Sequence, residues 1–244
     1  MEMLIGQGEV ALRDDQARAS ADFWAAVAIA AGAAGVIATS AFYGLSPPQA
    51  ALPMPDPMMA QASDAAATGA ALLKAGGTIG IVSDVVLVIG ALALMARRTA
   101  SKDGLERLGW AGIAVSALVF ITVDAMAGYV LPEVAAIPHS GAAFAGFKRL
   151  FDVLFVLGTL TFGAAMMAIF WNARRNGARI LGTIGCLAGI LATVVSCAYF
   201  VGVNLAQAIG ISVAVGSVLF TLLGVQLAMR AANGPALAPG ASSP

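Results

Sequence analysis

Six apolar stretches, each long enough to cross a lipid bilayer, occupy most of this chain of 244 residues. The hydrocarbon core of a bilayer is about 30 Å thick and needs about 20 apolar residues per helix. Hydrophobic residues make up 60% of the chain and charged residues 11%, whereas roughly 25% of residues in a soluble domain are charged. The stretches are apolar on every face, unlike the alternating strands of a membrane barrel. The sequence therefore predicts an all-α, polytopic transmembrane bundle of six helices, with spans at about 23–45, 76–96, 108–131, 150–171, 180–201 and 205–229. Residues 142–147 are also apolar, so an earlier start of the fourth span is the alternative.

Basic residues gather in alternate connections between these spans. Ten of them lie before span 1, between spans 2 and 3, between spans 4 and 5, or after span 6, and only Lys74, Lys148 and Arg149 lie elsewhere. Because cytoplasmic segments carry the excess of Lys and Arg, we expect both termini in the cytoplasm. The chain then divides into a cytoplasmic arm (1–21), a six-helix domain (22–230) and a flexible cytoplasmic tail (231–244). Heavy use of Ala and Gly favours a bacterial inner membrane.

The aromatic residues agree with this threading. Tryptophan and tyrosine concentrate at membrane interfaces, where an apolar ring and a polar group are both satisfied. We expect one set at the inner interface and the other at the outer interface. The inner set is Trp24, Trp110 and Trp171, and the outer set is Tyr43, Tyr129 and Tyr199.

Several functional classes lose support from the sequence. The formal net charge is zero, and no basic cluster interleaved with aromatic residues indicates a nucleic-acid partner. The sequence has no Ser/His/Asp set, phosphate loop or zinc-ligand spacing, so it favours a non-enzymatic protein. The only histidine is His139, outside every predicted span. We therefore expect no haem or other bound cofactor.

Two acids inside the predicted spans are the strongest candidates for function. At 1.5 Å per residue, Asp84 lies about 18 Å from Ala96 at the inner end of span 2, and Asp124 about 21 Å from Trp110 near that of span 3. Both are therefore expected in the outer half of the bilayer, where an unpaired charge costs several kcal/mol. With Lys148, Arg149 and Asp152 at the outer end of span 4, they predict an outward-facing polar pocket for binding or gating. The alternative is structural, and Lys148 and Asp152 in particular are spaced to form a local i, i+4 pair.

A second, weaker candidate is a copper site in the outer connections. Met54, Met58 and Met59 follow one another around prolines in the segment PMPDPMM, and thioethers are soft ligands for Cu(I). His139 is a possible fourth ligand. The alternative is that these methionines pack on the outer surface of the bundle or on a partner.

Small residues recur in the spans and predict close helix contacts, because association in lipid depends on packing and hydrogen bonds. We expect these contacts within one subunit, with an oligomer interface as the alternative. The residues concerned are Gly32, Gly35, Gly76, Gly77, Gly80, Gly210 and Gly216.

The segment 151–171 (FDVLFVLGTLTFGAAMMAIFW), the short basic connection with Arg174 and Arg175, and the segment 178–190 (ARILGTIGCLAGI) resemble the second half of DUF4386, a bacterial family of six-helix membrane proteins. The resemblance covers about two-thirds of the chain and includes the six-span plan. It implies no activity and no catalytic residues.

Two functions remain from this sequence. The first is an accessory or scaffold subunit, which would contact the lipid bilayer and pack against other membrane subunits or a second copy of itself. The alternative is a small transporter or sensor that admits an ion or polar solute from outside to Asp84 and Asp124.

Overall fold

The computed structural model describes residues 2–55, 57–97 and 104–233 and is helical over nearly all of them, with no strand in these ranges. Six helical segments are long and apolar enough to span a membrane, which confirms the predicted fold class. They are Ala19–Leu45 in α1 (Glu2–Leu45), then α4 (Ala70–Arg97), Gly104–Ala136 starting with α5 (Gly104–Ala125), α7 (Gly141–Arg175), α8 (Arg179–Phe200) and α9 (Ala206–Ala232).

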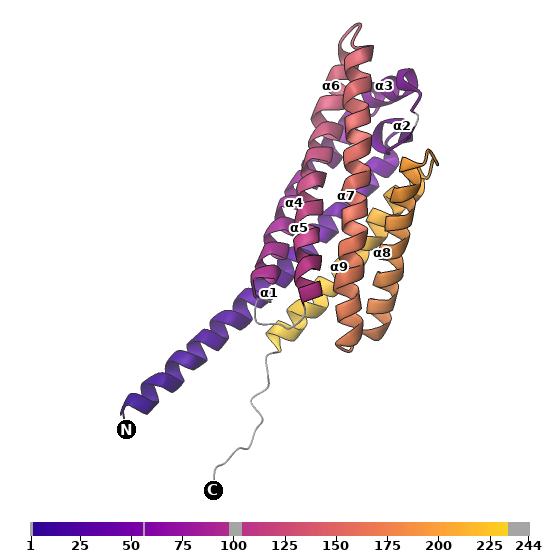
Figure 1. Cartoon of the computed structure of the whole chain (residues 1–244). Coiled ribbons are helices and arrows are strands. Elements are labelled where there is room, and N and C mark those ends of the chain that lie inside the picture. Colours follow the sequence, from indigo (N-terminus) through magenta and orange to yellow (C-terminus); the bar gives the residue numbers. More distant parts are fainter. Residues whose placement is uncertain (1, 56, 98–103, 234–244) are drawn as a thin grey trace.

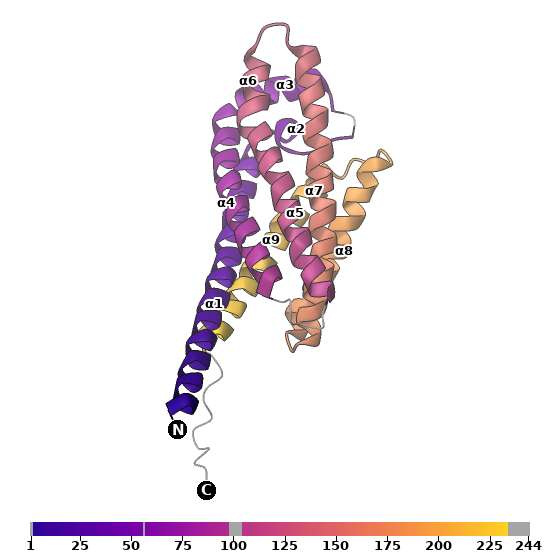
Figure 2. The ribbon, with the colours of Figure 1, turned by 60° about the vertical axis from the view of Figure 1, so that its left-hand side comes forward.

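The long helices form an elongated bundle (Figures 1 and 2). Neighbours around it follow the order α1, α4, α5, α7, α8 and α9, and α9 packs again on α1. The beginning of α1, the end of α9 and the turn between α7 and α8 lie at one end, which we call the terminal end. The other, the loop end, holds the turns after α6 and α8. The beginning of α1 and the end of α9 thus lie at the same end of the bundle, and their cytoplasmic location stays a prediction.

Two short helices, which follow α1 and precede α4 in the sequence, cover part of the loop end. They are α2 (Pro48–Ala51) and α3 (Met59–Thr68), and α3 packs against α6 (Leu131–Ala136) and α7. We call residues 46–55 the strap. Ala50 and Ala51 of the strap are fully buried, so this segment is packed into the bundle.

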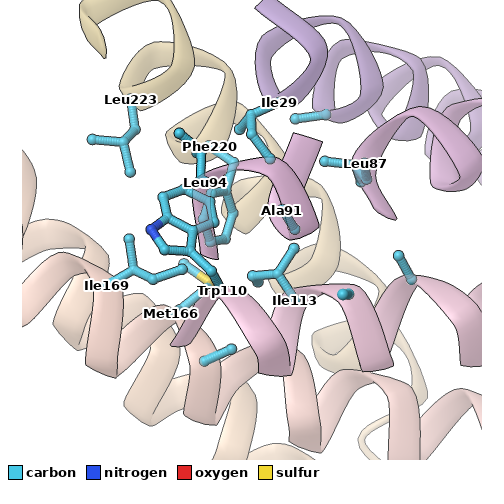
Figure 3. Close-up of a cluster of buried hydrophobic side chains, with 14 of the residues drawn as sticks. Ile29, Leu87, Ala91, Leu94, Trp110, Ile113, Met166, Ile169, Phe220 and Leu223 are labelled. Atoms are coloured by element: carbon cyan, nitrogen blue, oxygen red, sulfur yellow. The ribbon is translucent and has the colours of Figure 1, made fainter. Parts of the chain in front are cut away.

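A dry core fills the half of the bundle nearer the terminal end (Figure 3). The side chain of Trp110 lies in it with Ile169 and Leu223 close by, and its ring is 6.2 Å from that of Phe220 between centroids. The prediction that Trp110 anchors the membrane interface is wrong, because its side chain is fully buried. Its indole N–H is satisfied inside the bundle by the carboxyl of Glu106, at 3.3 Å.

The outer surface of the bundle is rich in exposed apolar side chains, such as Val82, Ile89, Leu118 and Leu187. In water such a surface would be strongly unfavourable, and in a bilayer it is the surface that meets lipid. Trp24 and Trp171 are also exposed, as interfacial anchoring predicts. The chain is therefore an integral membrane protein that contacts lipid.

The largest difference from the predicted spans is in α7, which begins at Gly141 instead of residue 150. A boundary placed at the charges of Lys148 and Arg149 starts this helix too late, and the alternative start within residues 142–147 is closer to the observed one. Lys148 is accommodated two turns inside the helix because its ammonium group has partners there. The predicted arm 1–21 also differs, since from Glu2 onward it continues α1. Of the predicted tail, residues 234–244 lie outside the described ranges.

Candidate functional site

Asp84 and Asp124 lie side by side inside the bundle. Asp84 comes from α4 and Asp124 from the last turn of α5, and they are only 2% and 4% exposed. Their carboxyl groups are close neighbours, and both line one small cavity. The depths inferred from the sequence thus correspond to a real contact, while a role in binding or gating stays a prediction.

Tyr43 completes this site from a third helix. It lies in the last turn of α1, and its hydroxyl donates a hydrogen bond of 2.7 Å to Oδ1 of Asp124. The prediction that Tyr43 anchors the outer interface is wrong, because its ring is buried and its hydroxyl bonds a carboxyl group. The sequence signal that could have placed Tyr43 in this site was its predicted position in the outer half of the bundle, where the two acids were also predicted. We call Tyr43, Asp84 and Asp124 the carboxyl site.

Two glycines of α4 make room for Asp124. A Cβ atom at position 77 would lie 2.5 Å from the backbone oxygen of Asp124, and one at position 80 would overlap its Oδ2 atom. Gly76, on the same helix, lies against the ring of Tyr43. The predicted small-residue face of this span is therefore a contact within the chain, and it positions the carboxyl site.

A π-helical turn follows Asp124 directly. This turn, η2 (Met126–Val130), joins α5 to α6, and the N–H of Leu131 bonds the oxygen of Met126, five residues earlier. Pro132 explains it, because proline has no N–H for the carbonyl four residues earlier and its ring would clash with that carbonyl. Such turns occur often at functional sites in membrane and soluble helices. Here the turn brings Gly128 against Gly77 of α4.

Replacing Gly80→Ala should disrupt the carboxyl site without removing any of its polar groups. The added methyl group displaces the carboxyl of Asp124 from Tyr43 and Asp84, and overpacking of this kind costs about 1–3 kcal/mol. Thermal unfolding in mild detergent measures the loss. The matched control is Gly146→Ala in α7, where a Cβ atom meets nothing within 4 Å. Equal stability of the two variants would contradict this packing.

Two small cavities adjoin the carboxyl site. One of about 30 Å³ is lined by all three residues of the site, and one of about 20 Å³ by Asp84 with Ser116 and Ser217. A cavity needs about 10–15 Å³ to hold one water molecule. Both cavities are therefore of the size that lets water reach a carboxyl group and exchange a proton with it.

Two larger cavities lead from the loop end toward this site. The vestibule, about 500 Å³, is lined by Met54, by Asn204 to Ala208 and by part of the strap. The inner cavity, about 280 Å³, reaches Ser40, Tyr43 and Phe155, which also line the 30 Å³ cavity beside the carboxyl site. Among the described residues, no charged side chain lines the vestibule or the inner cavity.

Lys148 and Asp152 form a separate buried pair on α7. Both are completely buried, and the ammonium group of Lys148 bonds Oδ1 of Asp152, which confirms the predicted i, i+4 pair. Lys148 also donates a hydrogen bond of 2.9 Å to the backbone oxygen of Leu52 and lies 4.8 Å from the ring centroid of Phe151. The Oδ2 atom of Asp152 has no hydrogen-bond partner. The pair is apart from the carboxyl site, and Phe155, one turn further along α7, lines the cavity of about 30 Å³ beside that site.

The remaining candidates are dispersed. Arg149 is exposed on the outside of α7 and belongs to neither group. Met58 and His139 are exposed, and His139 lies in the turn between α6 and α7 with a φ of 62°. Over the described ranges, no group of three His, Cys, Asp or Glu residues is arranged to hold a metal ion. The copper site stays a prediction.

The sequence did not indicate a polar cluster near the terminal end. Glu106 is 5% exposed and accepts hydrogen bonds from Trp110 and, at 2.5 Å, from the side-chain amide of Asn172. With Asn176, Gln226 and Arg230, this cluster lines a cavity of about 280 Å³. Its members come from α5, α7 and α9 and from the turn after α7. The signal in the sequence that could have indicated this polar cluster is that its members lie at similar depths near the ends of the spans.

Substituting Asn172→Leu should destabilise this end of the bundle by about 1–3 kcal/mol, because the buried carboxyl of Glu106 loses a donor. The control is Asn176→Leu, since Asn176 is exposed and donates to Asn172 from the helix end. Thermal unfolding in mild detergent compares them. A smaller loss for Asn172→Leu than for Asn176→Leu would show that this hydrogen bond contributes little.

Comparisons with known protein families, curated proteins and solved structures found no match. The resemblance to DUF4386 stays a prediction.

Proposed function

We propose that this chain is a small proton-coupled membrane transporter, in which Asp84 and Asp124 bind and release the proton. The observation that carries this function is the pair of carboxyl groups in contact inside the bundle. Intramembrane acids are rare because a charge costs several kcal/mol there, and acids of this kind form the proton relays of pumps and transporters. Two adjacent carboxyl groups resist carrying two charges, so the pair is suited to hold one exchangeable proton.

The cavities support access to the pair from the loop end. The vestibule shares lining residues with the inner cavity, and the inner cavity shares lining residues with the 30 Å³ cavity. Together they extend from Asn204 at the surface to Asp124 inside the bundle. Toward the terminal end, the bundle is filled by the core around Trp110 and Phe220, and the cavity at Glu106 lies beyond Trp110, which also lines it. Cavities at both ends with a packed layer between them fit a carrier that opens to one side at a time.

The residues that line the vestibule and the inner cavity favour an uncharged solute. They offer hydroxyl and amide groups, such as those of Ser40, Ser46 and Gln207, together with apolar side chains. A charged solute would leave its hydration shell without gaining an opposite charge. The inner cavity, at about 280 Å³, is larger than a proton or a single ion requires.

The accessory-subunit function stays a prediction. Such a subunit would use its small-residue faces and its outer loop with Met54, Met58 and Met59. Of these, the small-residue faces are occupied within the chain at Gly35, Gly80 and Gly216, which lie against Ser83, Asp124 and Phe162. No specific contact of the described residues favours it over transport.

Proteoliposomes that contain a pH-sensitive dye test this function with small uncharged solutes such as urea and glycerol. We expect a solute gradient to drive proton movement with the unmodified chain, and Asp84→Asn to abolish that movement. Asp64→Asn is the matched control, because Asp64 is exposed on α3. Solute movement without protons, or proton movement that survives Asp84→Asn, would contradict the proposed function.

A further inference from the structure

We propose that Leu52 is the gate between the vestibule and the inner cavity, and that Lys148 and Asp152 form the latch that holds it closed. This gate rests on the proposed function, because it controls how a solute reaches the carboxyl site.

Leu52 stands where the two cavities meet. Both are lined by Pro48 and Leu52 of the strap and by Gln207 and Ile211 of α9. The side chain of Leu52 reaches α9 closely enough that a Cβ atom at Gly210 would lie 2.9 Å from its Cδ2 atom. Leu52 is thus the apolar contact between the strap and α9, and moving it would join the vestibule to the inner cavity.

The backbone at Leu52 is held from the opposite side. Lys148 donates its hydrogen bond to the carbonyl of this same residue. Asp152 in turn binds the ammonium group that makes this bond, so the buried pair contacts the strap at position 52. The contact is long-range in sequence, since Lys148 and Leu52 are 96 residues apart.

The latch is built so that it can release. The Oδ2 atom of Asp152 is buried and has no hydrogen-bond partner. An orphaned acceptor of this kind gains a partner as soon as water enters. Movement of the strap away from α7 would admit water to both charges, which offsets part of the cost of losing the bond between Lys148 and Leu52. A closed state that leaves an acceptor unsatisfied lies closer in free energy to the open one.

Cysteine labelling tests the gate directly. In a background with Cys186→Ala and Cys197→Ala, Ser40→Cys places a thiol in the wall of the inner cavity. A charged, membrane-impermeant maleimide reaches it only through the aqueous route. Gln207→Cys, in the wall shared with the vestibule and exposed, is the control for reagent access.

We expect the thiol at position 40 to react slowly in the otherwise unmodified chain. Leu52→Ala, and separately Lys148→Met with Asp152→Leu, should accelerate the reaction about tenfold, as when an open state rises from about 1% to about 10% of the population. Labelling at position 207 should stay the same. Leu52→Ala leaves the buried pair intact, so it tests whether Leu52 is the gate even if the double variant does not fold.

Unchanged labelling at position 40 in Leu52→Ala would overturn the gate. Faster labelling in Leu52→Ala but not in a folded double variant would retain the gate and overturn the latch. Labelling needs no proton transfer at Asp84 or Asp124, so its result is independent of the Asp84→Asn experiment. If Leu52→Ala accelerates labelling but Asp84→Asn leaves proton movement intact, the proposed function fails. The solute route through the vestibule and the inner cavity would still be supported.

Discussion

Lys148→Met is expected to cost about 3–5 kcal/mol of unfolding free energy, because it leaves the buried carboxyl of Asp152 without its counter-charge. Both side chains are completely buried, so no bulk water compensates the lost partner. The strap also loses the hydrogen bond to the oxygen of Leu52. Thermal or denaturant unfolding in mild detergent measures the loss.

The control for this variant is Arg149→Met, one residue along the same helix, where the side chain is exposed. We expect it to change stability by less than about 0.5 kcal/mol. The combined change Lys148→Met with Asp152→Leu removes both charges and should restore most of the stability, since apolar replacements of buried pairs are often neutral. Similar losses for Lys148→Met and Arg149→Met would show that the pair does not stabilise the bundle.

Asp124→Asn and Asp124→Leu are expected to separate the chemistry of the carboxyl site from its packing. Asparagine keeps the shape and an oxygen that accepts from Tyr43, so we expect a change in stability of only about 1 kcal/mol. It cannot take up or release a proton in the physiological range. Proton-coupled solute movement in proteoliposomes should therefore fall to the level of empty vesicles.

Leucine at position 124 removes the acceptor as well, and the buried hydroxyl of Tyr43 is left unsatisfied at a cost of about 1–3 kcal/mol. The expected order of stability is therefore unmodified chain, Asp124→Asn, Asp124→Leu, with transport lost in both variants. Asp64→Asn should retain both properties. Transport that persists in Asp124→Asn would mean that the carboxyl group has only a structural role.

The sequence was sufficient to predict six membrane spans and to place Asp84 and Asp124 at similar depths in the bilayer. Apolar stretches identify membrane helices because water is absent from the bilayer core and the helix satisfies its own backbone. Counting the rise per residue along two antiparallel spans then placed Asp84 and Asp124 at one level. Their contact in the structure follows from that arithmetic together with the adjacency of α4 and α5.

What the sequence did not indicate depends on partners far away in the chain. A lysine marks a helix end unless its charge is compensated, and the carbonyl that bonds Lys148 belongs to Leu52, in a loop before the second span. Tryptophan and tyrosine are residue types that often anchor a protein at the membrane interface, but Trp110 and Tyr43 each donate a hydrogen bond to a carboxyl group in the interior. Glu106 depends in the same way on Asn172, which is 66 residues later.

A pH titration followed by infrared difference spectroscopy detects whether Asp84 and Asp124 hold an exchangeable proton. We expect the unmodified chain in liposomes to show a protonated carboxylic-acid band that disappears as the external pH rises. Asp84→Asn and Asp124→Asn should each remove or shift this band, and Asp64→Asn should leave it unchanged. A spectrum with no titrating carboxylic acid, or a band that both substitutions leave intact, would contradict an exchangeable proton held between Asp84 and Asp124.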